Sequence, residues 1–321
     1  MKSLRDVCLL VAVAATVSLL PSPVSAQDNG SAPDSMSRRQ RLRRFMEIRR
    51  NQAENKADIV SEESLGAHTQ NIVKDAYGGR DMILYVPSHL PEAGRRSMVV
   101  ALHGGMGNAR FMQEHLKMDG VAEKYGFIVA YLNGSPASAR LPDRFRAWDA
   151  GGGCCGEPYT DKVDDVGYIT GAVRYLQRKY GVDPARVFGT GHSNGAMMTQ
   201  TLMCETNLYR KAVSLAGSDM AEVDRCPDAR GKEILAIHGK DDQNVPPGGG
   251  RGTQGVTNIA YRSEADSQAK FRDSGGTYDI LWVDSDHSLE HMAAAVQKSE
   301  GISLAEKEAR FFGLSQQRRL K

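Results

Sequence analysis

The sequence lacks an excess of charge of either sign and has few aromatic residues. Among its 321 residues, 41 are Lys or Arg and 39 are Asp or Glu, so the formal net charge is +2, and aromatic residues make up only 7%. Residues 1–50 hold nine of the basic and four of the acidic residues, which leaves residues 51–321 slightly acidic, with 32 basic and 35 acidic residues. A slightly acidic chain offers little attraction to a polyanion. We therefore expect no nucleic acid among its partners.

Glycine and proline are too few for a fibrous or low-complexity chain. The sequence holds 33 Gly and 12 Pro, and 40% of its residues are hydrophobic. These proportions exclude a collagen, a coiled coil and a wholly disordered protein. They are typical of a globular enzyme with a buried core.

Long apolar runs are absent except near the N-terminus. Val7–Leu20 is an apolar run of 14 residues that follows Lys2 and Arg5, and small residues occupy 24–26. This order is typical of a cleavable secretory signal. A retained membrane anchor is the alternative, but a spanning helix needs about 20 apolar residues. We predict that residues 1–26 are a signal peptide and that the protein is secreted or periplasmic.

The sequence has few cysteines, and whether they form disulfides depends on export. Removal of the signal leaves four of the five cysteines, namely Cys154, Cys155, Cys204 and Cys226. An even number in an oxidising compartment favours two disulfides. Because a bond between trans-linked neighbours is geometrically unfavourable, we expect Cys154 and Cys155 each to pair with one of the other two, in an order that stays open. No C-x-x-C or histidine spacing supports zinc, so we expect no metal.

Residues 27–64 are predicted to be a leader that precedes the folded domain. Its first residues are small and polar, which favours disorder. Arg38–Arg50 then holds seven arginines, with Leu42, Phe45 and Met46 at helical spacing. This segment is either an amphipathic helix that contacts an anionic surface or a solvated spacer, and so few apolar residues favour the spacer.

From about residue 65 onward, strand-like and helix-like patterns alternate. Several strand-like runs are almost continuously apolar, as strands buried on both faces require. Such an alternation predicts one α/β domain over residues 65–315, with a mostly parallel sheet between two helix layers and Met82–Val86 as an antiparallel edge strand. The predicted strands are Met82–Val86, Met98–His103, Phe127–Asn133, Arg186–Gly191, Lys211–Ala216, Ile234–His238 and Tyr278–Val283. The predicted helices are Ala109–Tyr125, Val163–Tyr180, Asn194–Cys204, Tyr261–Ser274 and Ser303–Phe312.

The strongest chemical signal is the pentapeptide Gly191-His192-Ser193-Asn194-Gly195. It follows a predicted strand and opens a predicted helix, which is the setting of a nucleophile elbow. Glycines allow the backbone to turn sharply around the serine, and the helix N-terminus adds a positive dipole. An ordinary strand–turn–helix junction is the alternative. The flanks on both sides favour a catalytic Ser193.

A serine nucleophile needs a base, and the base needs a carboxylate that orients it. In a fold of this kind the acid follows the serine along the chain and the histidine comes last. Asp242 lies just after the strand that ends at His238 and is the predicted acid, with Asp241 as the alternative. His287 follows the last strand and is the predicted base, with His291 as the alternative.

Two further loops carry candidate binding residues. Attack on an ester produces an oxyanion that fixed N–H donors stabilise, and the glycine-rich loop His103–Gly107 and the N–H of Asn194 are the predicted donors. The loop Trp148–Gly156 fits neither a helix nor a strand. Trp148 is either an exposed aromatic that binds part of the substrate or a core residue. Just beyond this loop, Asp164 or Asp165 is expected to cap a long helix.

Four separated blocks resemble the secreted polyhydroxybutyrate depolymerase and feruloyl esterase group of enzymes. In chain order they are residues 102–105, 148–156 with 163–168, 191–198 and 238–246. The resemblance implies an α/β-hydrolase fold and a catalytic triad of Ser193, Asp242 and His287. It also implies an oxyanion donor at Gly105 and neither a metal nor a cofactor.

These patterns together predict a secreted serine esterase that hydrolyses carboxylic esters through an acyl-enzyme. Polyhydroxybutyrate-type oligomers or related hydroxyacyl esters are the leading substrates. A feruloyl or acetyl-xylan carbohydrate esterase is one alternative. A catalytically inactive exported binding protein is another, because Asp286 precedes His287 where the group carries glycine. The oligomeric state stays open.

Overall fold

The protein is represented by a computed structural model that describes residues 67–71 and 80–315. All of these residues belong to the unit Met36–Lys321. The predicted signal peptide, residues 1–26, and the predicted leader with its Arg38–Arg50 segment lie outside the described residues. Among the helices that are described, none combines the length and the apolarity needed to cross a membrane.

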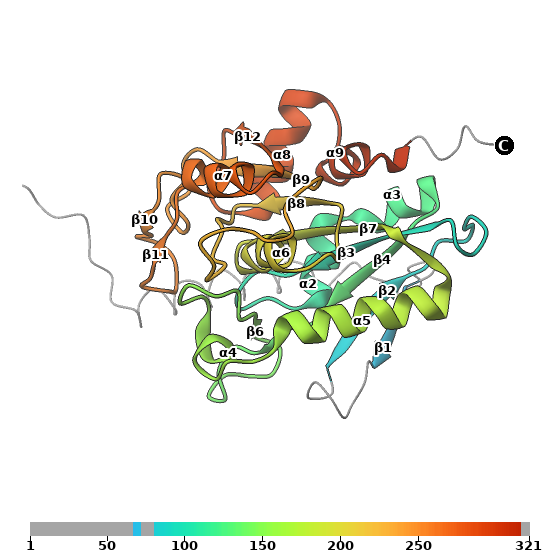
Figure 1. The fold of residues 1–321 in the computed structure, drawn as a ribbon, viewed down its shortest axis with the longest axis horizontal. Coiled ribbons are helices and arrows are strands. Elements are labelled where there is room, and N and C mark those ends of the chain that lie inside the picture. The colour runs from blue at the N-terminus through green and yellow to red at the C-terminus, as the bar shows by residue number, and fades with distance from the viewer. Residues whose placement is uncertain (1–66, 72–79, 316–321) are drawn as a thin grey trace, which may run out of the picture. The chain divides into compact units, whose positions relative to one another are not determined.

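A sheet of eight strands forms the centre of the described region (Figure 1). In spatial order its strands are β1 (Ala67–Asn71), β2 (Asp81–Tyr85), β4 (Ile128–Leu132), β3 (Arg96–Leu102), β7 (Val182–His192), β8 (Lys211–Leu215), β9 (Glu233–Gly239) and β12 (Thr277–Val283). The strands from β4 to β12 run parallel. Antiparallel pairing occurs between β2 and β4 and between β1 and β2. The predicted mostly parallel sheet is confirmed.

The predicted antiparallel strand is β2, but it is not the edge strand. The polar strand β1, Ala-His-Thr-Gln-Asn, bonds outside it, with Ala67 opposite Tyr85 and Asn71 opposite Asp81. Its sequence has no apolar run, so the pattern of buried strands did not reveal it. Two short pairs, β5 (Ser135–Pro136) with β6 (Arg146–Ala147) and β10 (Gly250–Arg251) with β11 (Ala260–Tyr261), stand outside the main sheet.

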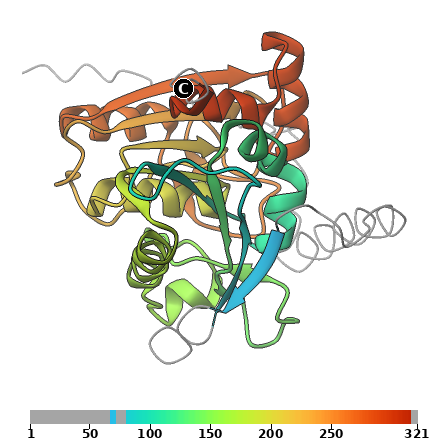
Figure 2. The same cartoon turned by 90° about the vertical axis from the view of Figure 1, so that its right-hand side faces the viewer.

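Helices cover both faces of the sheet, as predicted (Figures 1 and 2). One face packs against α5 (Asp165–Tyr180), α6 (Asn194–Glu205) and α7 (Glu264–Asp273), and the other against α2 (Ala109–Leu116), α3 (Met118–Tyr125), α8 (Leu289–Glu300) and α9 (Leu304–Phe311). The five-residue helix α4 (Gly156–Thr160) lies in the loop before α5. The central strands are buried on both sides because each layer supplies its own apolar cluster.

The predicted helix Ala109–Tyr125 is two helices in the structure. Lys117 adopts a left-handed conformation with φ 55°, and its N–H donates to the carbonyl of Gln113 at the end of α2. This residue therefore ends α2 and directly precedes α3. The apolar period runs on through the break, which is why the sequence predicted one helix.

The predicted helix Tyr261–Ser274 begins three residues late. Tyr261 pairs with Gly250 in the short β10–β11 ladder. The Ser263 hydroxyl then accepts the N–H of Asp266 and caps α7, which starts at Glu264. The long helix α5 is capped by Asp164, whose carboxylate accepts the Gly167 N–H at 2.7 Å.

The disulfides contradict the predicted pairing. Cys154 is bonded to its neighbour Cys155, and Cys204 is bonded to Cys226, with Cα atoms 4.4 Å apart in the second pair. The prediction assumed a trans peptide between the first two cysteines. That peptide is cis, with Cα atoms 2.9 Å apart. The second disulfide joins the end of α6 to the loop that follows β8.

Candidate active site

Ser193 lies at the turn from β7 into α6, in a backbone conformation of φ 56° and ψ −121°. Residues other than glycine rarely adopt such a backbone conformation. A Cβ on Gly191 would lie 2.3 Å from the carbonyl oxygen of Gly195, and a Cβ on Gly195 would lie 2.3 Å from that of Leu102. Gly191 is therefore required by the tight turn, which is the structural feature of a nucleophile elbow, and Gly195 is required by the close approach of the end of β3.

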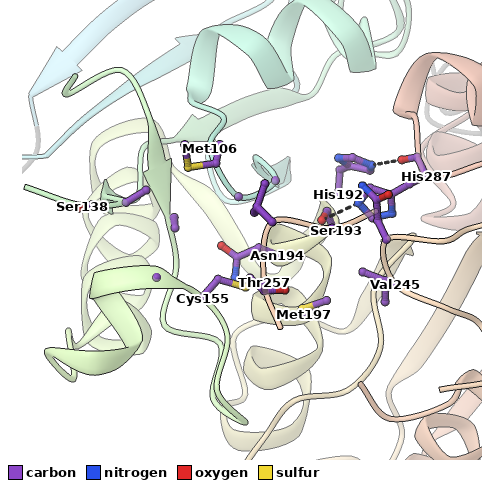
Figure 3. A pocket seen from close by; sticks show the side chains of 18 of the residues that line it. Met106, Ser138, Cys155, His192, Ser193, Asn194, Met197, Val245, Thr257 and His287 are labelled. Carbon is purple, nitrogen blue, oxygen red and sulfur yellow. Dashed lines mark hydrogen bonds between the residues drawn. The ribbon is translucent and has the colours of Figure 1, made fainter. Parts of the chain in front are cut away.

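Three loops bring Ser193, His287 and Asp242 into one hydrogen-bonded chain. The Ser193 hydroxyl lies 2.8 Å from Nε2 of His287 (Figure 3). Nδ1 of the same ring lies 2.7 Å from Oδ2 of Asp242. The loops follow β7, β9 and β12, whose carboxyl ends meet at one edge because the strands are parallel. The sequence predicted these three residues, and the structure brings them together.

The alternative residues lie outside this chain. Asp241 is exposed, and its N–H donates to the carbonyl of Ser285. His291 is 64% exposed and pairs through Nδ1 with Asp286 at 2.9 Å. Asp286 also accepts the N–H of Ser288, the residue that caps α8. The aspartate that departs from the family pattern thus orders the start of α8.

Four hydrogen bonds converge on the carboxylate of Asp242. Its Oδ1 accepts the N–H groups of Asn244 and Val245 at 2.8 and 2.9 Å, and its Oδ2 accepts from His287 and from His238. Burial by itself would raise the pKa of Asp242, but the charge of His287 and the hydrogen bonds from both histidines outweigh it and hold the pKa well below its usual range. Asp242 is therefore a carboxylate at neutral pH.

His192 is bonded to the loop that carries His287, the predicted base. Its Nε2 donates to the carbonyl oxygen of His287 at 2.9 Å (Figure 3). The two rings are 5.0 Å apart between centroids. The histidine inside the predicted elbow motif therefore positions the loop of the base.

Gly105 and Asn194, the two predicted oxyanion donors, both line the cavity beside Ser193. Their loops are in close contact, since a Cβ on Gly104 would lie 3.3 Å from the Cβ of Ser193, and one on Gly105 would lie 3.6 Å from that of Asn194. The residue after Gly105, Met106, is held in place by its N–H, which donates to the carbonyl of Arg146 at 2.7 Å. A rigid backbone beside the nucleophile is what oxyanion stabilisation requires.

Trp148 does not line the cavity, which corrects its predicted role in substrate binding. Its side chain is 0% exposed, and Nε1 donates to the carbonyl of His103 at 2.9 Å. Because the indole N–H finds a partner in the core, burial of the ring leaves no polar group unpaired. The sequence left two interpretations of Trp148 open, and the structure shows that it is a core residue.

The Asn194 side chain performs a second task that the sequence did not indicate. Its Oδ1 accepts the N–H of Trp148 at 2.8 Å, and its Nδ2 donates to the carbonyl of the same residue at 3.1 Å. This side chain fastens the loop of the paired cysteines to the elbow. No local pattern reveals such a contact, because the two residues lie 46 positions apart.

A cavity of about 620 Å³ opens beside Ser193 (Figure 3). Part of its wall is apolar and belongs to a small hydrophobic cluster that packs together: Met106, Ala137, Leu141, Ala147 and Val256. Polar groups, among them Ser138, Glu157 and Thr257, lie around the same space. The cavity also touches Cys155 of the first disulfide. The lining therefore offers both apolar and polar groups beside Ser193.

Two buried pairs of ionisable side chains were missed by sequence reasoning. His238 and Glu264 form a hydrogen-bonded pair behind Asp242, with Nδ1 and Oε1 2.6 Å apart. Asp165, expected at most to cap α5, is instead paired with Arg80, and burial raises its pKa to about 6 despite the opposing charge of Arg80. Within residues 67–71 and 80–315, no group of three His, Cys, Asp or Glu side chains is arranged to hold a metal ion.

Comparison with known proteins supports the resemblance to feruloyl esterases. No protein-family model matches the chain. The chain is 31% identical over 128 residues to feruloyl esterase B of Talaromyces stipitatus, which is 40% of this chain and 33% of that protein. It is 34% identical over 133 residues to a probable acetylxylan esterase A of Aspergillus fumigatus, which is 39% of this chain and 30% of that protein. The chain therefore spans about a third of the length of these relatives.

Among solved structures, the chain is similar to a propionate-bound esterase of Thermogutta terrifontis. The TM-score is 0.54 at 15% sequence identity, and the match covers 78% of this chain and 96% of that structure. At so low a sequence identity, the similarity shows the fold and not the function. The predicted α/β-hydrolase fold is confirmed.

Proposed function

We propose that this protein is a carboxylic ester hydrolase of the serine type. The observation that carries the proposal is the hydrogen-bonded chain from Ser193 through His287 to Asp242 at the mouth of the cavity. Support comes from the relatives, which are named feruloyl and acetylxylan esterases. The same chemistry accounts for the elbow glycines, the buried carboxylate and the glycine-rich loop beside the nucleophile.

In the first half of the reaction, Ser193 forms an ester with the acyl group. Nε2 of His287 accepts the hydroxyl proton as Oγ attacks the carbonyl carbon, and Asp242 stabilises the imidazolium through Nδ1. The N–H groups of Gly105 and Asn194 stabilise the oxyanion, a contribution of about 3–4 kcal/mol for each donor. His287 then protonates the leaving alcohol, and the tetrahedral intermediate collapses to the acyl-enzyme.

In the second half, water replaces the alcohol. His287 accepts a proton from water, the resulting hydroxide attacks the acyl carbon, and the same two N–H groups stabilise the second oxyanion. The bond between carbon and Oγ breaks, and Ser193 recovers its proton from His287. The products are one carboxylic acid and one alcohol, so the site needs no cofactor.

For the substrate, we propose hydroxyacyl esters of the polyhydroxybutyrate type, with feruloyl or acetyl esters of sugars as the second candidate. The apolar wall formed by Leu141 and Val256 suits a short acyl chain. The polar groups of Ser138 and Glu157 suit the hydroxyls of a sugar, and the names of the relatives favour this second class. Both classes share the ester carbonyl that the triad attacks.

Hydrolysis of an ester panel by the purified protein tests the proposal. The panel holds 3-hydroxybutyrate oligomers, methyl ferulate, acetylated xylan and short nitrophenyl esters. We expect at least one ester to be cleaved, and we expect Ser193→Ala and His287→Gln to lose at least about 10⁴-fold in kcat/KM. His291→Gln is the matched control and keeps wild-type activity. An inert wild-type protein across the panel would instead favour an exported binding protein.

We further propose that residues 65–315 are the catalytic domain and that the protein works outside the cytoplasm after loss of residues 1–26. Two disulfides in the described chain support an oxidising compartment. Expression of the full chain with its own N-terminus, followed by N-terminal sequencing of the exported product, tests the cleavage. We expect the mature chain to begin after Ala26, and an uncleaved product would contradict it.

We also propose that the Arg38–Arg50 segment makes a weak contact with an anionic surface, because it carries seven arginines. Partition of the mature protein to anionic vesicles, with and without residues 27–56, tests it. Equal partition of both proteins would contradict a surface contact.

A further inference from the structure

A second histidine is bonded to the aspartate of the triad. Nε2 of His238 lies 3.1 Å from Oδ2 of Asp242, the oxygen that also accepts from His287, and 2.9 Å from the carbonyl oxygen of Val245. Both neighbours of Nε2 are acceptors without a proton of their own, because Asp242 is ionised. Nε2 of His238 therefore carries a hydrogen.

The other ring nitrogen faces a second buried carboxylate. Nδ1 of His238 lies 2.6 Å from Oε1 of Glu264, and the Tyr278 hydroxyl donates to Oε2 of the same glutamate at 2.7 Å. His238 is 0% exposed, Glu264 1% and Asp242 3%. A cation that donates to both carboxylates satisfies all three groups, whereas a neutral ring would leave two buried carboxylates with no cation between them.

We propose that His238 is a protonated histidine that positions Asp242 and, together with Glu264, sets the pH at which His287 becomes able to accept the serine proton. The proposal rests on the proposed esterase function. His238 touches no substrate, so it is a positioning residue rather than a catalytic one.

The electrostatics of the site agree with a charged His238. Burial by itself lowers the pKa of His238, but the hydrogen bonds and charges of Asp242 and Glu264 outweigh burial and raise the pKa to about 9. The ring is bonded to Asp242 and Val245 of the loop that follows β9 and to Glu264 of α7, and Tyr278 of β12 is bonded to the same glutamate. From β12 the uncharged Trp282 ring also approaches, with centroids 6.3 Å apart.

Two further titratable groups interact with this chain through Asp242. They are His287, from the loop between β12 and α8, and Tyr261 of β11, whose phenol senses the charge of Asp242. Of these, His287 is the one whose protonation decides activity. The positive charge of His238 disfavours protonation of His287. The negative charge of Glu264 favours it and so offsets the effect of His238.

Three variants separate an electrostatic role from a structural one. His238→Gln keeps an N–H near Asp242 but removes the cation, so the anion of Glu264 acts on His287 unopposed. The acidic limb of the kcat/KM–pH profile should move up by about one pH unit. His238→Gln/Glu264→Gln removes both charges and should return the limb toward the wild-type position. His89→Gln, a half-exposed histidine paired with Glu123, is the matched control and should leave the limb unchanged.

Nuclear magnetic resonance tests the protonation state without using activity. In protein labelled with ¹⁵N-histidine, we expect both ring nitrogens of His238 to carry protons at pH 7, with the signals assigned by their loss in His238→Gln. A neutral His238 at pH 7 would overturn the proposal, and so would a correctly folded His238→Gln whose acidic limb stays in place. If no ester is cleaved, the esterase function fails, while the ¹⁵N spectrum still decides the charge of His238.

Discussion

At the residue scale, the proposed triad depends on the ionisation of one buried carboxylate. Asp242 is 3% exposed, and burial would favour its neutral form, yet it accepts hydrogen bonds on both oxygens from two backbone N–H groups and two histidines. A carboxylate that is satisfied in this way stays ionised and holds the His287 ring in the tautomer that leaves Nε2 free to accept a proton.

Replacement of Asp242 by Asn should lower kcat by about 10⁴-fold, because an amide cannot stabilise the imidazolium and can present its NH₂ group to Nδ1 of His287. Asp241→Asn is the matched control, since Asp241 is the exposed neighbour outside the chain of hydrogen bonds. Initial rates on the preferred ester measure both. Equal losses in the two variants would contradict the assignment of the acid.

At the element scale, α6 begins directly after Ser193, the proposed nucleophile, and carries a disulfide near its last turn. Ser193 precedes the helix, Asn194 bonds the loop at Trp148, and Cys204 near its C-terminus is joined to Cys226. Lys232, a buried lysine, donates through Nζ to the carbonyls of Met203 and Thr206 at the same end. The helix behind the nucleophile is thus fixed at both ends by residues distant in sequence.

Removal of the Cys204–Cys226 disulfide, with Ser at both positions, should lower the free energy of unfolding by about 3 kcal/mol. The two cysteines enclose a loop with a sequence separation of 22, and the loss reflects the greater freedom of the unfolded chain. Urea denaturation of the variant and of wild type under non-reducing conditions measures the difference. Because Ser193 lies at the other end of α6, kcat on the preferred ester should change little at low temperature, and an unchanged urea midpoint would contradict a stabilising role.

At the scale of the whole molecule, buried ionisable groups lie on both sides of the sheet. His238 lies near the end of β9 and is paired with Glu264 of α7, in the helix layer on one face. Glu308 of α9, in the helix layer on the other face, is 0% exposed. Burial raises the pKa of Glu308 to about 8, which the nearby hydroxyl of Thr190 partly offsets. The folded protein therefore keeps a proton that the unfolded chain has lost at neutral pH.

This difference predicts how stability depends on pH. Below the ordinary glutamate pKa of 4.5, Glu308 is protonated in both states, and the stability it contributes is fully present. As the pH rises to about 8, that contribution is lost, by an amount on the order of 4 kcal/mol. Glu308→Gln cannot titrate, so its unfolding free energy relative to wild type should increase over this range. Thermal or urea unfolding from pH 4.5 to 8.5 measures the change.

Glu306→Gln, from the same helix, is the control for this prediction. Burial tends to raise the pKa of Glu306, but hydrogen bonds from Tyr125, Arg310 and Lys124 outweigh burial and lower it. Its contribution to stability is therefore present above about pH 4.5 and is lost only as the pH falls further. A flat difference between Glu308→Gln and wild type across the range would show that Glu308 is ionised in the folded protein.

The sequence alone was enough to predict features that depend on short spacing and chain order. The alternation of apolar strands with helices predicted the parallel sheet and its two helix layers. The five residues around Ser193 predicted a sharp turn, because only glycines fit on either side of it, and the position of Asp242 and His287 after successive strands predicted that they meet. The loops that follow parallel strands lie at the same edge of the sheet, because the carboxyl ends of those strands lie at that edge.

Only the tertiary structure decided the contacts that join distant segments. These contacts depend on which surfaces pack together. They are the burial of Trp148, the pairing of the cysteines, the hydrogen bonds of the Asn194 side chain and the His238–Glu264 pair. A local pattern shows which residue type occurs at a position, but not which atom lies opposite it. The physical reason is that hydrogen bonds and buried charges are satisfied by specific partners in three dimensions, and those partners are as much as 46 residues away in the case of Asn194 and Trp148.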